Sequence, residues 1–120
     1  MATQWDGDIP IYVQLYQQVI RRILDDHLLE GEALPSVRKV ASEYQLNPVT
    51  VSKAYQMLQE EEIVEKQRGK GLFIKEGVKK VILARERINF LEKEWPVVLD
   101  QIARLNLSAE DLLADRQGGK

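Results

Sequence analysis

The sequence has no cysteine and one histidine, His27, among its 120 residues. Without cysteine there are no disulfide bonds and no thiolate metal ligands, and a lone histidine without partners at ligand spacing offers no metal site. No apolar run approaches the ~20 residues that span a bilayer. The N-terminal residues MATQWDGDIP also lack the basic and apolar regions of a secretory signal. We therefore expect a cytoplasmic protein that binds no metal, cofactor or membrane.

Catalytic signatures are absent as well. Acidic pairs such as Asp25 and Asp26 fall at predicted helix ends, outside any apolar pocket. The stretch Arg68-Gly69-Lys70-Gly71 lacks the spacing of a phosphate-binding P-loop, and no βα unit surrounds it. We therefore expect no enzymatic activity.

An excess of basic charge is missing too, since 17 Lys and Arg against 19 Asp and Glu give a net charge of −2. Nucleic-acid-binding domains are often strongly basic, so the net charge argues mildly against that class. The local distribution weakens the objection, because seven basic residues face five glutamates between Arg38 and Lys75. A field focused on one face can attract DNA even when the whole molecule is slightly acidic.

Three stretches in the first half of the chain have the spacing of amphipathic helices. Apolar residues recur at helical intervals over residues 11–28 and 36–44, and the serine that opens the second stretch is a suitable N-cap. Asn47 and Pro48 then supply an N-cap and a proline at the first helical position. They predict a third helix over residues 48–61.

The third predicted helix has one apolar face and one face with little charge. Its apolar residues fall at intervals of three and four and must face the core: Val51, Ala54, Tyr55 and Leu58. The opposite face holds hydroxyl, amide and methyl groups with one charge: Val49, Lys53 and Gln56, flanked by Thr50 and Ser52. Such a face suits a helix that reads base edges.

A hairpin with a basic, glycine-rich tip follows this helix. Residues 63–65 and 72–75 are short β-prone runs, separated by the sequence KQRGKG. The glycines permit positive φ and a close approach of the backbone to a phosphate. The alternative to a phosphate-binding tip is a simple glycine turn whose charges only increase solubility.

The last third of the chain returns to helical spacing over residues 78–105. Pro96 interrupts it, so we expect a kink or break near Trp95. A short helix follows Ser108, and the terminal GGK is expected to be disordered. Apolar residues spread beyond one stripe, and exposed patches of that kind mark partner surfaces, although the helix could instead fold back on the first one. We therefore expect residues 78–120 to form a helical dimerisation region.

The order helix, turn, helix, hairpin predicts an α+β fold. We expect a winged helix-turn-helix DNA-binding domain over residues 1–77, followed by a short α-helical dimerisation extension. In such a domain one helix enters the major groove and a basic loop lies beside it. Winged helices also serve as protein-interaction modules without specific DNA binding, and a salt-dependent shift of operator DNA separates the two functions.

Four ordered motifs resemble the GntR family of bacterial transcription regulators: PIYVQLYQQVIRRIL, L-x-x-G-x-x-LPSVRKVA, NPVTVSKAYQMLQ and R-G-K-G-L-F-I. They cover about residues 9–75. The short remainder is similar to the YtrA-like subfamily, in which a two-helix dimerisation extension replaces a large effector domain. The resemblance therefore implies a winged helix-turn-helix, a homodimer and a role in transcription regulation.

The resemblance also implies which positions contact DNA: Arg38, Asn47, Pro48, Val49, Thr50, Ser52, Lys53, Arg68 and Gly69. The chain departs from the family pattern at two places where glycine is usual. Asp26 stands near the end of the first helix, and Glu62 stands just after the third. Neither lies on the reading face, so the departures put local geometry in doubt more than function.

We expect a sequence-specific transcription regulator, a repressor, that binds an inverted-repeat operator in double-stranded DNA as a homodimer. Polar and basic side chains would contact phosphates and base edges, and Val49 would pack on a thymine methyl group. Some relatives fuse this domain to a pyridoxal-phosphate aminotransferase, but the chain is far too short for one. No residue pattern points to a small-molecule effector.

Overall fold

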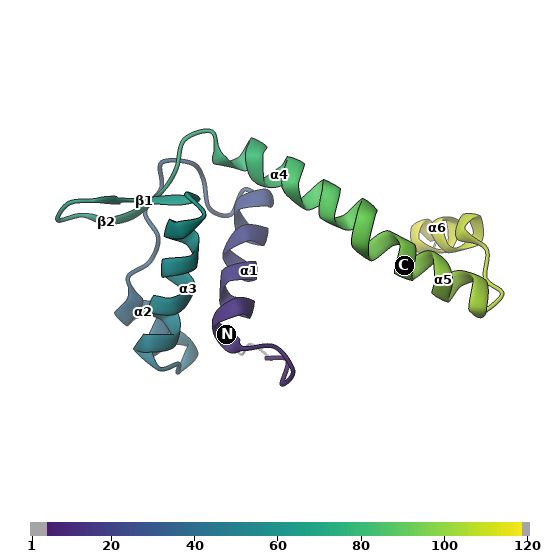
Figure 1. Ribbon diagram of the computed structural model, residues 1–120, viewed down its shortest axis with the longest axis horizontal. Helices are drawn as coiled ribbons and strands as arrows, with labels where there is room; N and C mark the ends of the chain where they lie inside the picture. Colours follow the sequence, from purple (N-terminus) through teal and green to yellow (C-terminus); the bar gives the residue numbers. More distant parts are fainter. Residues whose placement is uncertain (1–4, 119–120) are drawn as a thin grey trace. The chain divides into compact units, whose positions relative to one another are not determined.

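The computed structural model describes residues 5–118, with side chains as far as Ala114. The chain divides into two compact units, residues 1–83 and 84–120. The first unit contains the helices α1 (Ile11–Leu24), α2 (Val37–Tyr44) and α3 (Pro48–Glu60), then the antiparallel strands β1 (Val64–Gln67) and β2 (Gly71–Ile74). Helix α4 (Val78–Asn89) begins in this unit and ends in the second, which continues with η1 (Phe90–Glu94), α5 (Trp95–Arg104) and α6 (Ala109–Gly118) (Figure 1).

Side-chain caps set the starts of α2 and α3. Ser36 Oγ accepts the N–H of Lys39 at 3.1 Å, and Asn47 Oδ1 accepts the N–H of Val49 at 2.9 Å. Pro48 fills the first position of α3, where its missing N–H would have no intrahelical partner. The two helix starts that the sequence predicted are confirmed.

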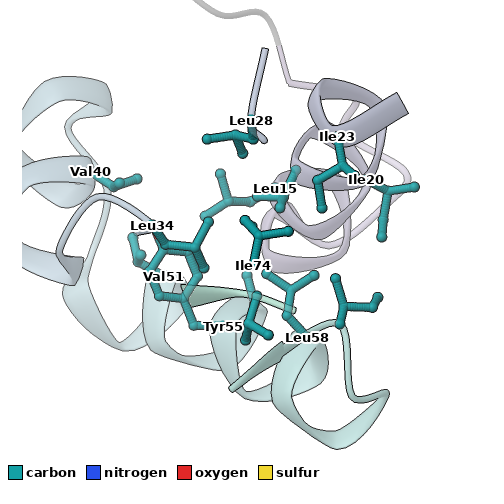
Figure 2. Packing of buried hydrophobic residues seen from close by; sticks show 14 of the residues in the cluster. Leu15, Ile20, Ile23, Leu28, Leu34, Val40, Val51, Tyr55, Leu58 and Ile74 are labelled. Carbon is teal, nitrogen blue, oxygen red and sulfur yellow. The ribbon is translucent and has the colours of Figure 1, made fainter. Parts of the chain in front are cut away.

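One apolar cluster holds the first unit together. The predicted stripe of α3 is buried: Val51, Ala54, Tyr55 and Leu58. It packs against α1, which lies beside α3 and buries Leu15, Val19, Ile20 and Ile23. Figure 2 shows Leu15 of α1, Leu58 of α3 and Ile74 of β2 gathered in this cluster. Helix α3 is therefore fixed in rotation as well as in position.

Tyr55 adds a polar tie to the same face of α3. Its hydroxyl donates a hydrogen bond of 2.8 Å to the carbonyl oxygen of Pro35, in the segment that leads into α2. Burial raises the pKa of Tyr55 to about 12, so the hydroxyl stays protonated and remains a donor at neutral pH.

Helix α1 is shorter than predicted, since it ends at Leu24 rather than at residue 28. Asp26 has a φ of 62°, in the left-handed region. The N–H groups of His27 and Leu28 turn back and donate to the carbonyl oxygen of Arg22, at 2.8 Å and 3.1 Å. This reversal ends the helix and returns Leu28 to the core. Leu28 is therefore buried, although it lies in the loop after α1 and not in the helix.

The strands of the hairpin reach further toward its tip than predicted, and a third segment pairs with the hairpin. The strands align Val64 with Ile74 and Gln67 with Gly71, where the sequence indicated residues 63–65 and 72–75. The loop before α2 adds an isolated bridge between Ala33 and Phe73, and Leu34 N–H donates to the carbonyl of Leu72 at 2.8 Å. These bonds anchor the base of the wing to the segment ahead of α2. The small sheet with its helices confirms the α+β winged helix-turn-helix prediction.

The first unit continues past Gly77, the predicted boundary, to Leu83. The reason is that Val78 and Ile82, in the first turns of α4, are buried in its core. The predicted disordered tail begins at Gly118, which closes α6 in the structure, while residues 119–120 lie outside the described residues.

The helical run is continuous from residue 78 to residue 104, and a π-helical segment stands where the sequence predicted a kink or break near Trp95. The segment η1 is π-helical, and the N–H of Trp95 donates to the carbonyl of Phe90, five residues earlier. Pro96 follows directly. Proline cannot donate, and its ring crowds the carbonyl four residues before it, so a wider turn at this point relieves the clash. Phe90 and Trp95 stack across the wide turn with ring centroids 6.2 Å apart.

Glu62 has a φ of 59°, the left-handed conformation that glycine adopts without strain. We expect Glu62→Gly to remove ~1 kcal/mol of backbone strain. The substitution also removes the exposed ion pair in which Lys75 Nζ lies 3.1 Å from the Glu62 carboxylate, worth ~0–1 kcal/mol. Urea unfolding should therefore show an unchanged or higher free energy of unfolding.

Glu62→Ala is the matched control, because it loses the same ion pair but keeps a Cβ in the left-handed conformation. It should be ~1 kcal/mol less stable than Glu62→Gly. An alanine variant as stable as the glycine variant would show that the backbone at this position is not strained.

Candidate nucleic-acid interface

The face of α3 opposite the core is open to solvent. Val49 is 62% exposed, an unusual state for a valine, and Ser52 and Lys53 are exposed beside it. Gln56 is exposed one turn further along, where its amide donates to the Glu60 carboxylate at 3.3 Å. Thr50 is half-buried at the edge of this face. The structure thus brings four of the predicted site residues together on one surface, Val49, Thr50, Ser52 and Lys53.

Two predicted site residues at the start of α3 have structural roles. The side-chain oxygen of Asn47 is engaged by the N–H of Val49, and Pro48 occupies the first helical position. Both residues are exposed. The cap fixes the first turn of α3, in which the N–H groups of Thr50 and Val51 also donate, to the carbonyl oxygen of Asn47.

Arg38 lies on α2 and faces the start of α3 across an open groove. The residues that line this groove are Val37, Arg38, Ala41, Ser42, Leu46 and Pro48. Arg38 is exposed, so its guanidinium stands at the rim of the groove with its donors available.

The turn between α2 and α3 passes through Gln45, whose φ of 55° is left-handed. The sequence did not predict this conformation.

The tip of the hairpin carries the remaining predicted residues. Arg68, Gly69 and Lys70 are exposed between the two strands, and Figure 1 shows the hairpin extending away from the helices. Gly69 and Gly71 have φ values of 75° and 110°, so the turn requires glycine at both positions. No atom lies within 4 Å of where a Cβ would stand on either glycine, so the tip is open for a close approach of another molecule.

Lys53 has a partner that the sequence analysis missed. Its ammonium nitrogen lies 5.3 Å from the centroid of the Tyr12 ring, in the first turn of α1. The distance is that of a cation–π contact. Tyr12 was not predicted because it is 41 positions away in the chain, and only the packing of α1 on α3 brings the two residues together.

Residues 5–118 were compared with the requirements of a metal site and of a membrane span. No group of three or more His, Cys, Asp or Glu side chains there is arranged to hold a metal ion. No helix in the same range is both long and apolar enough to cross a membrane. In the first unit the α3 face, the Arg38 groove and the basic wing tip are exposed, and these features suit an extended anionic partner.

Residues 11–74 match the family described as "Bacterial regulatory proteins, gntR family". The match spans the three helices and both strands of the first unit. The chain belongs to the GntR family. GntR proteins are regulators of transcription with a DNA-binding winged helix, so this chain is a GntR-family transcription regulator with such a domain.

Two curated relatives extend the likeness beyond the winged domain. The HTH-type transcriptional repressor YtrA of Bacillus subtilis is 34% identical over 92% of this chain and 90% of its own length. The uncharacterized HTH-type transcriptional regulator YhcF of the same organism is also 34% identical, over 94% of this chain and 92% of its own. The predicted YtrA-like resemblance is confirmed, and these relatives are regulators rather than enzymes.

Solved structures agree with the fold. A GntR-family transcriptional regulator from Listeria monocytogenes superposes with a TM-score of 0.76 over 97% of this chain and all of its own, at 25% identity. The DNA-binding domain of AraR, solved in complex with operator ORX1, has a TM-score of 0.53 over 62% of this chain at 17% identity. The second likeness concerns the fold of the winged domain alone.

Proposed function

We propose that this chain is a homodimeric repressor that binds an inverted-repeat operator in double-stranded DNA in the cytoplasm. The observation that carries the proposal is the rigid exposed face of α3, which presents a valine, hydroxyl groups and a single charge beside a basic wing. The repressor role is supported by the name of the YtrA relative, and the DNA partner by the operator complex of the AraR domain.

Within this proposal, the predicted site residues divide into two groups. Val49, Thr50 and Ser52 lie on the open face of α3, where a methyl group meets a thymine methyl and hydroxyls meet base edges in the major groove. Arg38 is exposed on α2 and Arg68 is exposed at the wing tip, where they would meet the phosphates that flank the groove.

The backbone and cap residues complete the site. Gly69 allows the backbone of the wing to approach the duplex closely. Asn47 caps α3 and Pro48 begins it, so both residues hold the exposed first turn of the reading helix in place beside the duplex.

The second unit supports the dimer. None of its described side chains is buried, yet it exposes large apolar residues along its whole length: Ile88, Phe90, Leu91, Val97, Val98, Leu99, Leu105, Leu107, Leu112 and Leu113. A soluble monomer rarely leaves so continuous a set of apolar side chains open to water. We assign residues 78–120 to dimerisation, with α4 entering that region from the DNA-binding domain. A two-fold partner matches an operator with two inverted half-sites.

Base reading and phosphate binding are separated by their salt dependence. Arg68→Ala should weaken binding to specific and scrambled duplexes alike and reduce the salt slope by about one ion. Val49→Ala should instead change preference at one or two base positions by ~1–3 kcal/mol with the salt slope unchanged. The measurement is binding across a randomised operator library at two salt concentrations.

The matched control for Arg68 is Arg21→Ala, the same charge change at an exposed position in the last turn of α1. Arg21→Ala should leave the affinity for both duplexes and the salt slope near their wild-type values. If the wild-type chain selects no sequence from the library, sequence-specific DNA binding is rejected. The alternative function, a protein-interaction module, then takes its place.

Self-association is tested by a charge placed on the apolar surface. Leu91→Lys and Leu99→Lys should each produce a monomer, because a lysine in a dimer interface would be desolvated without a partner. Both variants should lose most of their affinity for a two-half-site duplex, since linked binding to both half-sites is lost. Sedimentation velocity and titration of one-half-site and two-half-site duplexes measure the two effects.

Gln101→Lys, an exposed polar position of α5 in the same unit, is the control and should remain dimeric. Leucine variants that sediment as dimers would place the dimer interface elsewhere, and a monomeric wild-type chain would reject the dimer altogether.

A further inference from the structure

Lys53 differs from Arg38, Arg68 and Lys70 at the proposed DNA surface because its ammonium contacts an aromatic ring. Its ammonium lies over the Tyr12 ring at 5.3 Å, and no ion pair within the described residues engages it. Lys75 and Lys79, in contrast, each pair with a carboxylate, at 3.1 Å and 2.6 Å. An aromatic ring attracts a cation by its quadrupole but leaves the positive charge in place, whereas a carboxylate neutralises it. Lys53 is thus held in position and remains fully available to an anion.

The contact also draws the side chain of Lys53 away from the middle of the reading face. Tyr12 belongs to the first turn of α1, and its half-buried ring packs against the apolar core. The ring is therefore a fixed part of the domain, while the four-carbon stem of a lysine is otherwise free to rotate. With its ammonium on α1, Lys53 lies at the flank of α3 rather than over the centre of its exposed face. In helix-turn-helix complexes the phosphate backbone borders the groove that holds the reading helix, so a cation at the flank of that helix lies nearer to phosphates than to base edges.

We propose that Tyr12 is a positioning residue for DNA binding, which holds the Lys53 ammonium where it contacts a backbone phosphate beside the start of α1. Lys53 then contributes to affinity and not to base preference. The inference rests on the proposed function, since it needs α3 to lie in the groove. Fixing the ammonium before binding reduces the entropy that its immobilisation on a phosphate would otherwise cost.

The experiment uses the full chain and two duplexes of equal length, one that the wild-type chain selects from a random library and one scrambled. The variants are Lys53→Gln, Tyr12→Leu, the double variant, and Tyr12→Phe, which keeps the ring and loses the hydroxyl. Dissociation constants are measured at several salt concentrations, and thermal unfolding of each variant reports on folding.

Lys53→Gln should weaken binding to both duplexes, reduce the salt slope by about one ion and leave the selected sequence unchanged. Tyr12→Leu should weaken binding about two- to fivefold, the size of an exposed cation–π contact, in the wild-type background only. It should have no further effect in the Lys53→Gln background, because its action passes through Lys53. Tyr12→Phe should bind like the wild type.

Several results would overturn the proposal. If Lys53→Gln alters the base preference and leaves the salt slope unchanged, Lys53 reads a base and does not bind a phosphate. Lys53 is exposed, so its substitution should not disturb the core. Equal losses from Tyr12→Leu in both backgrounds, or a loss from Tyr12→Phe, show that Tyr12 acts without Lys53. A wild-type chain that selects no duplex rejects the proposed function and this inference together, whereas the other outcomes reject the inference alone.

Discussion

The burial of one face of α3 against α1 is the constraint on which the rest of the first unit depends. Val51, Ala54 and Leu58 have no exposed surface. A helix whose apolar stripe is completely covered cannot rotate about its axis without exposing that stripe or burying polar groups. The residues that lie about half a turn away from the stripe are therefore held in the solvent-facing position. The surface that we propose for DNA is a consequence of core packing.

Two helix ends have a left-handed acidic residue where glycine is usual, and each of these residues pairs with a lysine. Asp26 and Glu62 have φ values of 62° and 59°, and their carboxylates pair with Lys79 and Lys75. Glu30 adds a third tie, since its carboxylate accepts the N–H of Lys79 at 3.0 Å. Hydrogen bonds from the backbone N–H groups of Gly77 and Lys79 hold the pKa of Glu30 below its ordinary value. The contacts of Asp26 and Glu30 with Lys79 join the loop after α1 to the first turn of α4.

Local rules were sufficient for much of this fold. The caps at Ser36 and Asn47 and the stripe of α3 follow from short-range sterics and periodicity, and the structure has them. Ahead of Pro96 the structure has a π-helical segment in place of the predicted kink or break. The family motifs also predicted the glycine-dependent wing tip. They identified Asp26 and Glu62 as departures from glycine, and both residues have a left-handed backbone conformation. For the site, the same rules gave the exposed face of α3, while the assignment of individual DNA contacts rests on the resemblance.

What could not be predicted depends on segments that are distant in the chain. The bridge from Ala33 to Phe73 and the contact of Lys53 with Tyr12 need the elements to be packed first. The end of α1 was misplaced because Leu28 continues the helical spacing, although an aspartate in the left-handed region had already ended the helix. Periodicity reports which residues are buried, and it does not report from which element they reach the core.

The central claim, that the outward face of α3 lies in the major groove, can be tested by DNA cleavage from a tethered iron chelate. The natural chain has no cysteine, so a single Gln56→Cys substitution gives one attachment site at the middle of that face. The account predicts two clusters of strand cleavage, placed symmetrically in the two half-sites of the selected operator. Chelate attached through Asp25→Cys, an exposed position at the far end of α1 from Tyr12, should cleave little. Equal cleavage from both positions, or no cleavage in the half-sites from position 56, would contradict the claim.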